Sequence, residues 1–245
     1  IIPKFETSAE LIEFSHRAVS GVLLIITLII FVKSFNDEVP ILQKRIIWFL
    51  TFFVVLEALI GAVIVVYEWV GLNSSTPRII AVPLHLVNTF GLLGTYTLLF
   101  HLTKNSKTSL INFFDRGFKI GLFLFLLSGA TGSIAALADA LFPSESFLAG
   151  LAEDFDSKSQ ILTRLRILHP LSASALSVYL YSEANRLQSE YKVITKNIKL
   201  LILLGVLLGV LNVVSNIILP LSILHLLIAD LLWIVYVYKS AEKII

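Results

Sequence analysis

The sequence contains no cysteine and no methionine. Without cysteine the chain can form no disulfide, hold no metal ion through a thiolate and use no thiol nucleophile. Because methionine is absent even from position 1, the chain is expected to be a fragment or a processed product, unless modified methionines are missing from the sequence.

Charge is also scarce. Charged residues make up 15% of the chain, and the net charge of +2 is too small to indicate nucleic-acid binding. Hydrophobic residues make up 57%, and the mean hydropathy is +0.89. Soluble domains of this length are much more polar. The sequence therefore predicts an all-α polytopic protein embedded in a lipid bilayer.

Seven apolar runs are long enough to cross a hydrocarbon core of ~30 Å, which needs about 20 helical residues. Lysine and arginine gather after the first, third and fifth runs and in the tail, whereas 142–160 is mainly acidic. By the positive-inside rule, alternate runs starting with the first cross from outside to inside. The N-terminus is then outside, which predicts a further helix before Ile1 and an eight-helix parent. The predicted spans are roughly 11–33, 46–67, 80–102, 117–141, 161–182, 198–218 and 220–238.

Four of the five histidines share one predicted depth. His16, His85, His169 and His225 each lie near the start of an outside-to-inside span, roughly 10 Å from the outer surface. A single membrane histidine usually makes an interhelical hydrogen bond. Four at matched depth on alternate spans favour metal ligation, and paired imidazoles suit haem iron. His101, at the inner end of its span, is predicted to be interfacial without a site role.

An internal repeat pairs these histidines. The segment IEFSHRAVSGVLLI around His16 is similar to LRILHPLSASALSV around His169, and AVPLHLVNTFGLL around His85 is similar to PLSILHLLIADLL around His225. The repeat predicts two half bundles related by a pseudo-two-fold axis along the membrane normal. The simplest model pairs histidines within each half as two bis-histidine haem sites, with cross-pairing between the halves left open. The predicted halves are 1–110 and 111–245, each with one haem site.

The two halves differ beside their first histidines. Glu13 lies three residues before His16, whereas Arg166 lies three residues before His169. A carboxylate there can accept a proton or stabilise a cation, which predicts a reactive first site. Arg166, with Arg164, can pair with a haem propionate, which predicts an electron relay in the second. The alternatives are a solvated carboxylate at a helix N-terminus for Glu13 and interfacial anchoring for the arginines.

Two more carboxylates fall inside predicted spans. Glu57 and Asp230 each need a partner or a water path, and each can instead be protonated and serve packing, so their roles stay open. Asn88 shares a helix face with His85 and is a candidate to line the same pocket.

Small residues and one proline mark predicted helix packing. Gly205 and Gly209 form a GxxxG pattern, and 128–133 reads SGATGS; both are interpreted as close packing rather than chemistry. Pro170 is predicted to kink the span 161–182 beside the second site.

The segments IEFSHRAVSG, LEALIGAVIVV, VPLHL and SILHL resemble the haem A synthase family of cytochrome oxidase assembly. The resemblance spans essentially the whole chain and is stronger in the first three spans. It implies eight helices in the cell inner (plasma) membrane, with the haem sites toward the outer face. The implied activity is oxidation of the C8 methyl of haem O to a formyl group by successive hydroxylations. The implied partners are a membrane enzyme that supplies haem O and an unidentified electron acceptor.

The resemblance also implies residue roles. His16 and His85 would flank the substrate haem O, with Glu13 as the essential carboxylate, and His169 and His225 would ligate a haem b cofactor.

The residue after each first histidine also carries an expectation. Arg17 would contact a haem propionate, and Pro170 replaces the arginine common in the family, so Arg164 or Arg166 is expected to substitute. Family members often carry cysteine pairs in the outer loops, and 142–160 has none.

Two other function classes remain open from the residues alone. One is a di-haem b electron-transfer cytochrome without substrate chemistry. The other is a haem-free transporter with intramembrane histidines.

Overall fold

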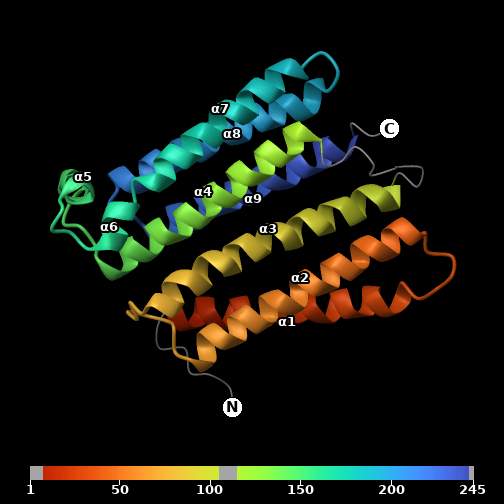
Figure 1. The fold of residues 1–245 in the computed structure, drawn as a ribbon, viewed down its shortest axis with the longest axis horizontal. Helices are drawn as coiled ribbons and strands as arrows, with labels where there is room; N and C mark the ends of the chain where they lie inside the picture. The colour runs from red at the N-terminus through yellow and green to blue at the C-terminus, as the bar shows by residue number, and fades with distance from the viewer. Residues whose placement is uncertain (1–7, 105–114, 243–245) are drawn as a thin grey trace.

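The computed structural model describes residues 8–104 and 115–242, and the regular elements in these ranges are all helices, which confirms the all-α prediction. The helices are shown in Figure 1. Their bounds are α1 Ser8–Lys33, α2 Ile41–Val66, α3 Thr76–Lys104, α4 Arg116–Leu141, α5 Phe147–Phe155, α6 Ile161–Leu165, α7 Leu168–Arg186, α8 Lys192–Val214 and α9 Leu219–Glu242.

Six of the described helices are long and apolar enough to cross a membrane, namely α1, α2, α3, α4, α8 and α9. They coincide with six of the seven predicted spans and support a multi-pass membrane protein. The predicted span 161–182 corresponds to α6 and α7 together, and neither meets that standard alone. The count of seven spans and the pseudo-two-fold relation stay predictions.

The predicted span 161–182 is interrupted, because α6 ends at Leu165 and α7 begins at Leu168. The cause lies in Pro170. Proline has no amide proton, so it cannot donate to the carbonyl of Arg166 four residues earlier, and its ring crowds that carbonyl. The distortion predicted beside Pro170 is present as an interruption of the helix just before His169.

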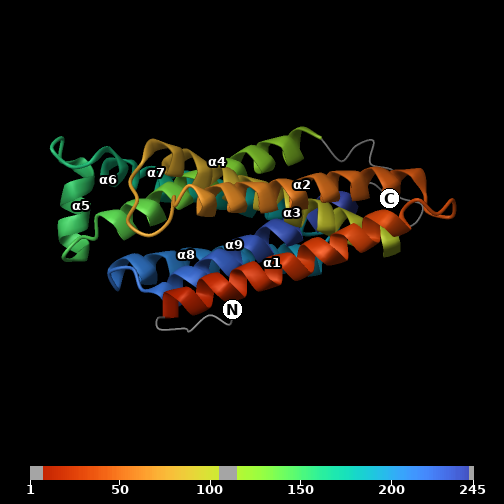
Figure 2. The same ribbon diagram turned by 90° about the horizontal axis from the view of Figure 1, so that it is seen from below.

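The long helices alternate in direction along one axis, and α5 and α6 lie at one end of the bundle (Figures 1 and 2). Helix α2 packs against α1 and α3, and α8 packs against α7 and α9. Helix α3 joins these two groups by packing on α4 and α9. The predicted boundary between the halves, at 110 and 111, lies outside the described residues.

Aromatic side chains form the core between α3, α4 and α9. The rings of Phe125 and Trp233 lie 4.9 Å apart, and the indole nitrogen of Trp233 donates to the backbone oxygen of Phe90 at 2.8 Å. Tyr236 donates to the backbone oxygen of Gly117 at 3.1 Å. Apolar side chains on α1 and α8 are instead largely exposed, as expected for surfaces that contact lipid. The core therefore fixes α3 and α9, which each carry one of the four histidines.

Candidate functional site

Two pairs of histidine rings meet in the structure. The ring centroid of His16 on α1 lies 6.4 Å from that of His85 on α3, and the ring planes are inclined at 85°. The centroids of His169 on α7 and His225 on α9 are 6.1 Å apart, with planes at 88°. The structure thus brings the histidines together within each predicted half. Their role as haem ligands stays a prediction.

Each pair is supported by a group of three helices. The histidines of the first pair stand on the two neighbours of α2, and those of the second on the two neighbours of α8. Helices α1, α3, α7 and α9 run in one direction (Figure 1), and each of the four histidines stands in the first half of its helix, so all four lie toward the same end of the bundle. This arrangement agrees with the common depth predicted from the sequence.

The second pair is oriented by backbone carbonyls. The Nδ1 atom of His169 lies 3.2 Å from the oxygen of Ser128 on α4, and that of His225 lies 3.0 Å from the oxygen of Gly205 on α8. A carbonyl can only accept, so we assign the proton of each ring to Nδ1. This tautomer leaves the Nε2 lone pair of each ring available to a metal ion.

Glycines provide the space for the second pair. A Cβ atom at Gly132 would lie 2.9 Å from Cε1 of His169, and one at Gly209 would lie 3.1 Å from Cε1 of His225. Sequence reasoning assigned both glycines to helix packing alone. In the structure they also seat the imidazole rings, and each stands four residues after the residue whose carbonyl meets Nδ1.

The first pair has a carboxylate in this position. Glu57 on α2 accepts hydrogen bonds from Asn88 Nδ2 and Thr89 Oγ1, each at 2.5 Å. Its Oε1 lies 3.5 Å from Nδ1 of His85. Glu57, whose role the sequence left open, therefore has defined partners, and Asn88 lies in the network as its shared face with His85 predicted.

Glu13 and Arg17 form an ion pair along α1, one helical turn apart and on either side of His16 in sequence. Both side chains are about half exposed, at 50% and 52%. Glu13, the predicted catalytic carboxylate, is thus near His16 in the chain and is paired with Arg17, the predicted propionate ligand. An exposed ion pair is weak, so Glu13 can exchange Arg17 for another partner.

Arg166 is fully engaged by other protein groups. It donates to Asp154 at 2.8 Å, to Asp139 at 2.9 Å and to Glu153 at 3.4 Å. It also donates to the Ser144 hydroxyl and the Gly150 carbonyl, both at 3.2 Å, so all five guanidinium protons have acceptors.

These contacts bear on the predicted propionate role. Arg166 would have to give up protein partners to bind a propionate. Arg164, by contrast, is exposed and forms no ion pair within residues 8–104 and 115–242. Of the two arginines, Arg164 is the one whose charge is available.

The residues present fit a haem at each pair. Two imidazoles bound to one metal ion through nitrogens about 2 Å from it place their ring centroids roughly 6 Å apart, and both pairs have such a separation. In the described part of the chain there is no group of three or more histidine, aspartate or glutamate side chains arranged for a bare metal ion. Pairs of imidazoles instead match the donor set of a bis-histidine haem.

Two other polar side chains are buried away from the pairs. His101 is fully buried in the last turn of α3, with its ring 5.2 Å from that of Tyr238, and its interfacial depth stays a prediction. Neither of its ring nitrogens has a hydrogen-bond partner among the described residues. Asp230 likewise buries an unpartnered carboxylate oxygen, and its role stays open.

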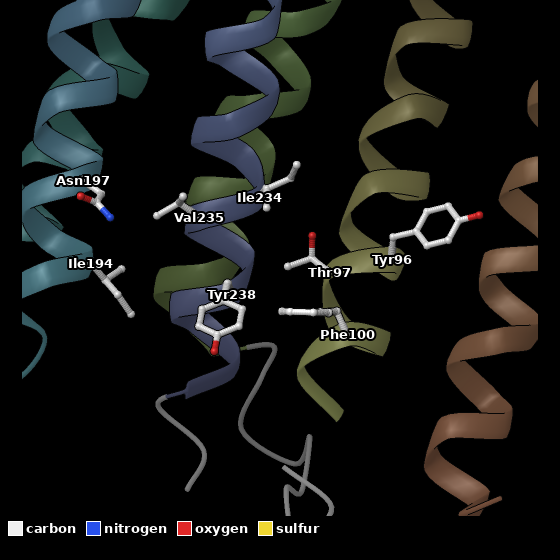
Figure 3. A pocket seen from close by; sticks show the side chains of 8 residues that line it. All are labelled: Tyr96, Thr97, Phe100, Ile194, Asn197, Ile234, Val235 and Tyr238. Carbon is white, nitrogen blue, oxygen red and sulfur yellow. The ribbon is translucent and has the colours of Figure 1, made fainter. Parts of the chain in front are cut away.

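A separate pocket of about 440 Å³ opens between the later turns of α3 and α9 and the start of α8 (Figure 3). It is mainly apolar and contains no histidine, so we place the candidate site at the histidine pairs, which carry the chemistry. The pocket is lined by Tyr96, Thr97, Phe100, Ile194, Asn197, Ile234, Val235 and Tyr238.

Comparison with known proteins identifies the family. A family model described as COX15-CtaA, cytochrome oxidase assembly protein, matches residues 2–237. The chain belongs to the COX15-CtaA family. The resemblance to the haem A synthase family of cytochrome oxidase assembly is thereby confirmed at the level of the family.

Two curated relatives of this COX15-CtaA chain come from two strains of Thermus thermophilus, and both are named protoheme IX farnesyltransferase. Each is 30% identical over 264 aligned residues, covering 100% of this chain and 42% of the relative. The chain therefore spans about two fifths of the length of these relatives. No solved structure matches the chain significantly.

Proposed function

We propose that the chain is a haem A synthase, which oxidises the C8 methyl group of haem O to a formyl group. The observation that carries this proposal is the contrast between the two histidine pairs of this COX15-CtaA protein. Both have the ring separation of a bis-histidine site. Carboxylates accompany the first pair, with Glu13 beside His16 and Glu57 beside His85.

The relatives support a farnesylated haem as substrate. Their name describes farnesyl transfer to protohaem IX, and haem O is a farnesylated haem. We infer that a separate membrane enzyme supplies haem O to this chain. The charge pattern of the connecting loops supports an orientation with both pairs toward the outer face, and the family resemblance favours the cell inner membrane.

The reaction needs two successive oxidations of one carbon. In each, the methyl carbon loses two electrons and a proton and gains a hydroxyl group from water, and loss of water from the resulting diol leaves the formyl group. His16 and His85 hold the substrate, and the Glu13 carboxylate accepts the proton of the attacking water. An acceptor outside this chain takes the electrons.

The second pair serves electron transfer in this proposal. His169 and His225 would hold haem b, which supplies the chemistry of a one-electron relay when bound. The carbonyls of Ser128 and Gly205 fix both rings in one tautomer. We infer that Arg164, which is exposed, contacts a propionate of that haem.

Pigment extraction tests the proposal. The protein is produced in cells that make haem O, purified, and its haems are identified by mass. Haem O, a hydroxylated product or haem A is expected beside haem b. Two b haems without haem O or A would identify a di-haem electron-transfer cytochrome instead, and a colourless protein would favour a haem-free transporter.

The Glu13→Gln variant tests the carboxylate. Removal of a general base typically costs a factor of about 100 or more, so haem A should fall by at least that factor while haem O still binds. Glu145→Gln changes an exposed carboxylate on the α4–α5 connection and serves as the matched control. Full haem A production by Glu13→Gln would refute this role.

A further inference from the structure

Three of the four histidines rest on the same local arrangement of a neighbouring helix. In each case Cε1 is the ring atom that lies nearest to a glycine of the neighbouring helix. The residue four positions before that glycine provides the group that lies near Nδ1. We call this arrangement the histidine cradle. The three cradles are Glu57 and Gly61 on α2 for His85, Ser128 and Gly132 on α4 for His169, and Gly205 and Gly209 on α8 for His225.

The cradle of His85 differs from the other two in the group that faces Nδ1. A backbone carbonyl meets Nδ1 of His169 and of His225. In the first cradle Nδ1 of His85 has no hydrogen-bond partner among the described residues, and the carboxylate oxygen Oε1 of Glu57 lies 3.5 Å from it. The ring also stands farther from its glycine, because a Cβ at Gly61 would lie 3.8 Å from Cε1 of His85.

Glu57 is held in place from α3. Asn88 donates to the Oε2 atom of Glu57, and Thr89 donates to Oε1. Asn88 also donates to the backbone oxygen of Phe53 at 2.9 Å, and Thr89 donates to the carbonyl of His85 at 3.1 Å. These contacts hold the side chain in place, so the first cradle presents a carboxyl group to the ring where the other two present a backbone carbonyl.

We propose that Glu57 is a positioning residue that acts through His85 and gives the iron bound at the first pair a lower reduction potential than the iron at the second. A carboxylate partner makes a ligating imidazole more basic and electron-rich, which stabilises oxidised iron. The inference rests on the proposed function, because it needs a haem at each pair. It assigns the electronic difference between the two sites to one side chain on α2.

The test compares variants at equivalent positions of two cradles. Glu57→Gln keeps the shape of the side chain but makes the acceptor neutral. Ser128→Ala changes a side chain whose backbone carbonyl, not its hydroxyl, meets His169. Glu57→Asp retains the charge and separates electrostatics from loss of packing. All are purified as full chains, loaded with protohaem and titrated by spectroelectrochemistry, with the two haems assigned in a His169→Ala background.

Glu57→Gln should raise the midpoint potential of the first haem alone and weaken binding of added protohaem at that pair by about 10- to 100-fold. Ser128→Ala should change neither potential, and Glu57→Asp should keep the low potential of the first haem. Two bound haems whose potentials do not respond to Glu57→Gln, or respond equally, would overturn the inference alone. A chain that binds no protohaem at either pair would overturn the proposed function and the inference with it.

Discussion

At the scale of single residues, the position of His169 depends on the missing side chain of Gly132. The Nδ1 atom of the ring lies against the Ser128 carbonyl, and its Cε1 atom lies where a side chain at residue 132 would begin. A β-carbon at 2.9 Å from the ring is closer than side-chain contacts allow. Because the ring is fixed on both sides, it has little freedom to move away without losing its hydrogen bond.

Gly132→Ala should therefore destabilise the protein by about 1–3 kcal/mol, the usual cost of overpacking, and reduce haem bound at the second pair. Gly61→Ala is the matched control, because its new Cβ would lie 3.8 Å from His85, an ordinary contact. Thermal unfolding in detergent and haem content by absorbance measure both effects. Equal thermal stability and equal haem content of the two variants would contradict the claim that Gly132 provides the space for the His169 ring.

The sequence could predict the histidines and their pairing, because residue type, distance from the start of an apolar run and internal repeats can all be read from the sequence. It could not predict what faces their second ring nitrogens. The carbonyl partners are Ser128 and Gly205, and any residue has a carbonyl, so no residue type marks them. The sequence shows Glu57 as a carboxylate that is costly to place in a membrane. Its contact with His85 joins two helices, so only the three-dimensional structure reveals it.

At the scale of elements, Arg166 ties together three parts of one end of the bundle. Its partners come from α4 through Asp139, from the α4–α5 connection through Ser144, and from α5 through Glu153 and Asp154. Arg166 itself stands in the interruption between α6 and α7, which precedes His169. The network therefore anchors the short helix α5 and stabilises the chain just before the second histidine pair.

Arg166→Ala should lower the free energy of unfolding by about 3 kcal/mol, because it leaves the mostly buried carboxylates Asp139 and Asp154 without their cation. Arg164→Ala, at an exposed position without an ion pair among the described residues, should change it by less than about 0.5 kcal/mol. Chemical denaturation in mixed micelles gives the two values. Limited proteolysis of 142–160 should also speed up for Arg166→Ala, and an unchanged rate would argue against the anchoring role.

Element boundaries show where sequence reasoning reaches its limit. Long apolar runs predicted six spanning helices correctly, because hydropathy averages well over about 20 residues. The nine-residue helix α5 was not predicted, since such a segment is too short for a hydropathy window to separate from a loop. The interruption before Leu168 was also missed, because Pro170 was expected to kink the helix rather than end one and start another.

At the scale of the whole molecule, the two histidine pairs belong to two groups of helices joined through α3. Helices α1 to α3 carry the first pair, and α7 to α9 carry the second. The aromatic core between α3, α4 and α9 holds the groups together. If each pair holds one haem, replacing either histidine of a pair removes the same haem as replacing both.

Haem stoichiometry in single and double variants tests this arrangement. His16→Ala, His85→Ala and their combination should each leave about one haem per chain, because the variants of a pair remove the same site and are not additive. Combining His16→Ala with His169→Ala should leave none, because it breaks both pairs. Cross-pairing of His16 with His169 between the halves would instead leave one haem in that double variant. Pyridine haemochrome absorbance against protein concentration separates the two outcomes, and the ring contacts of the structure favour the first.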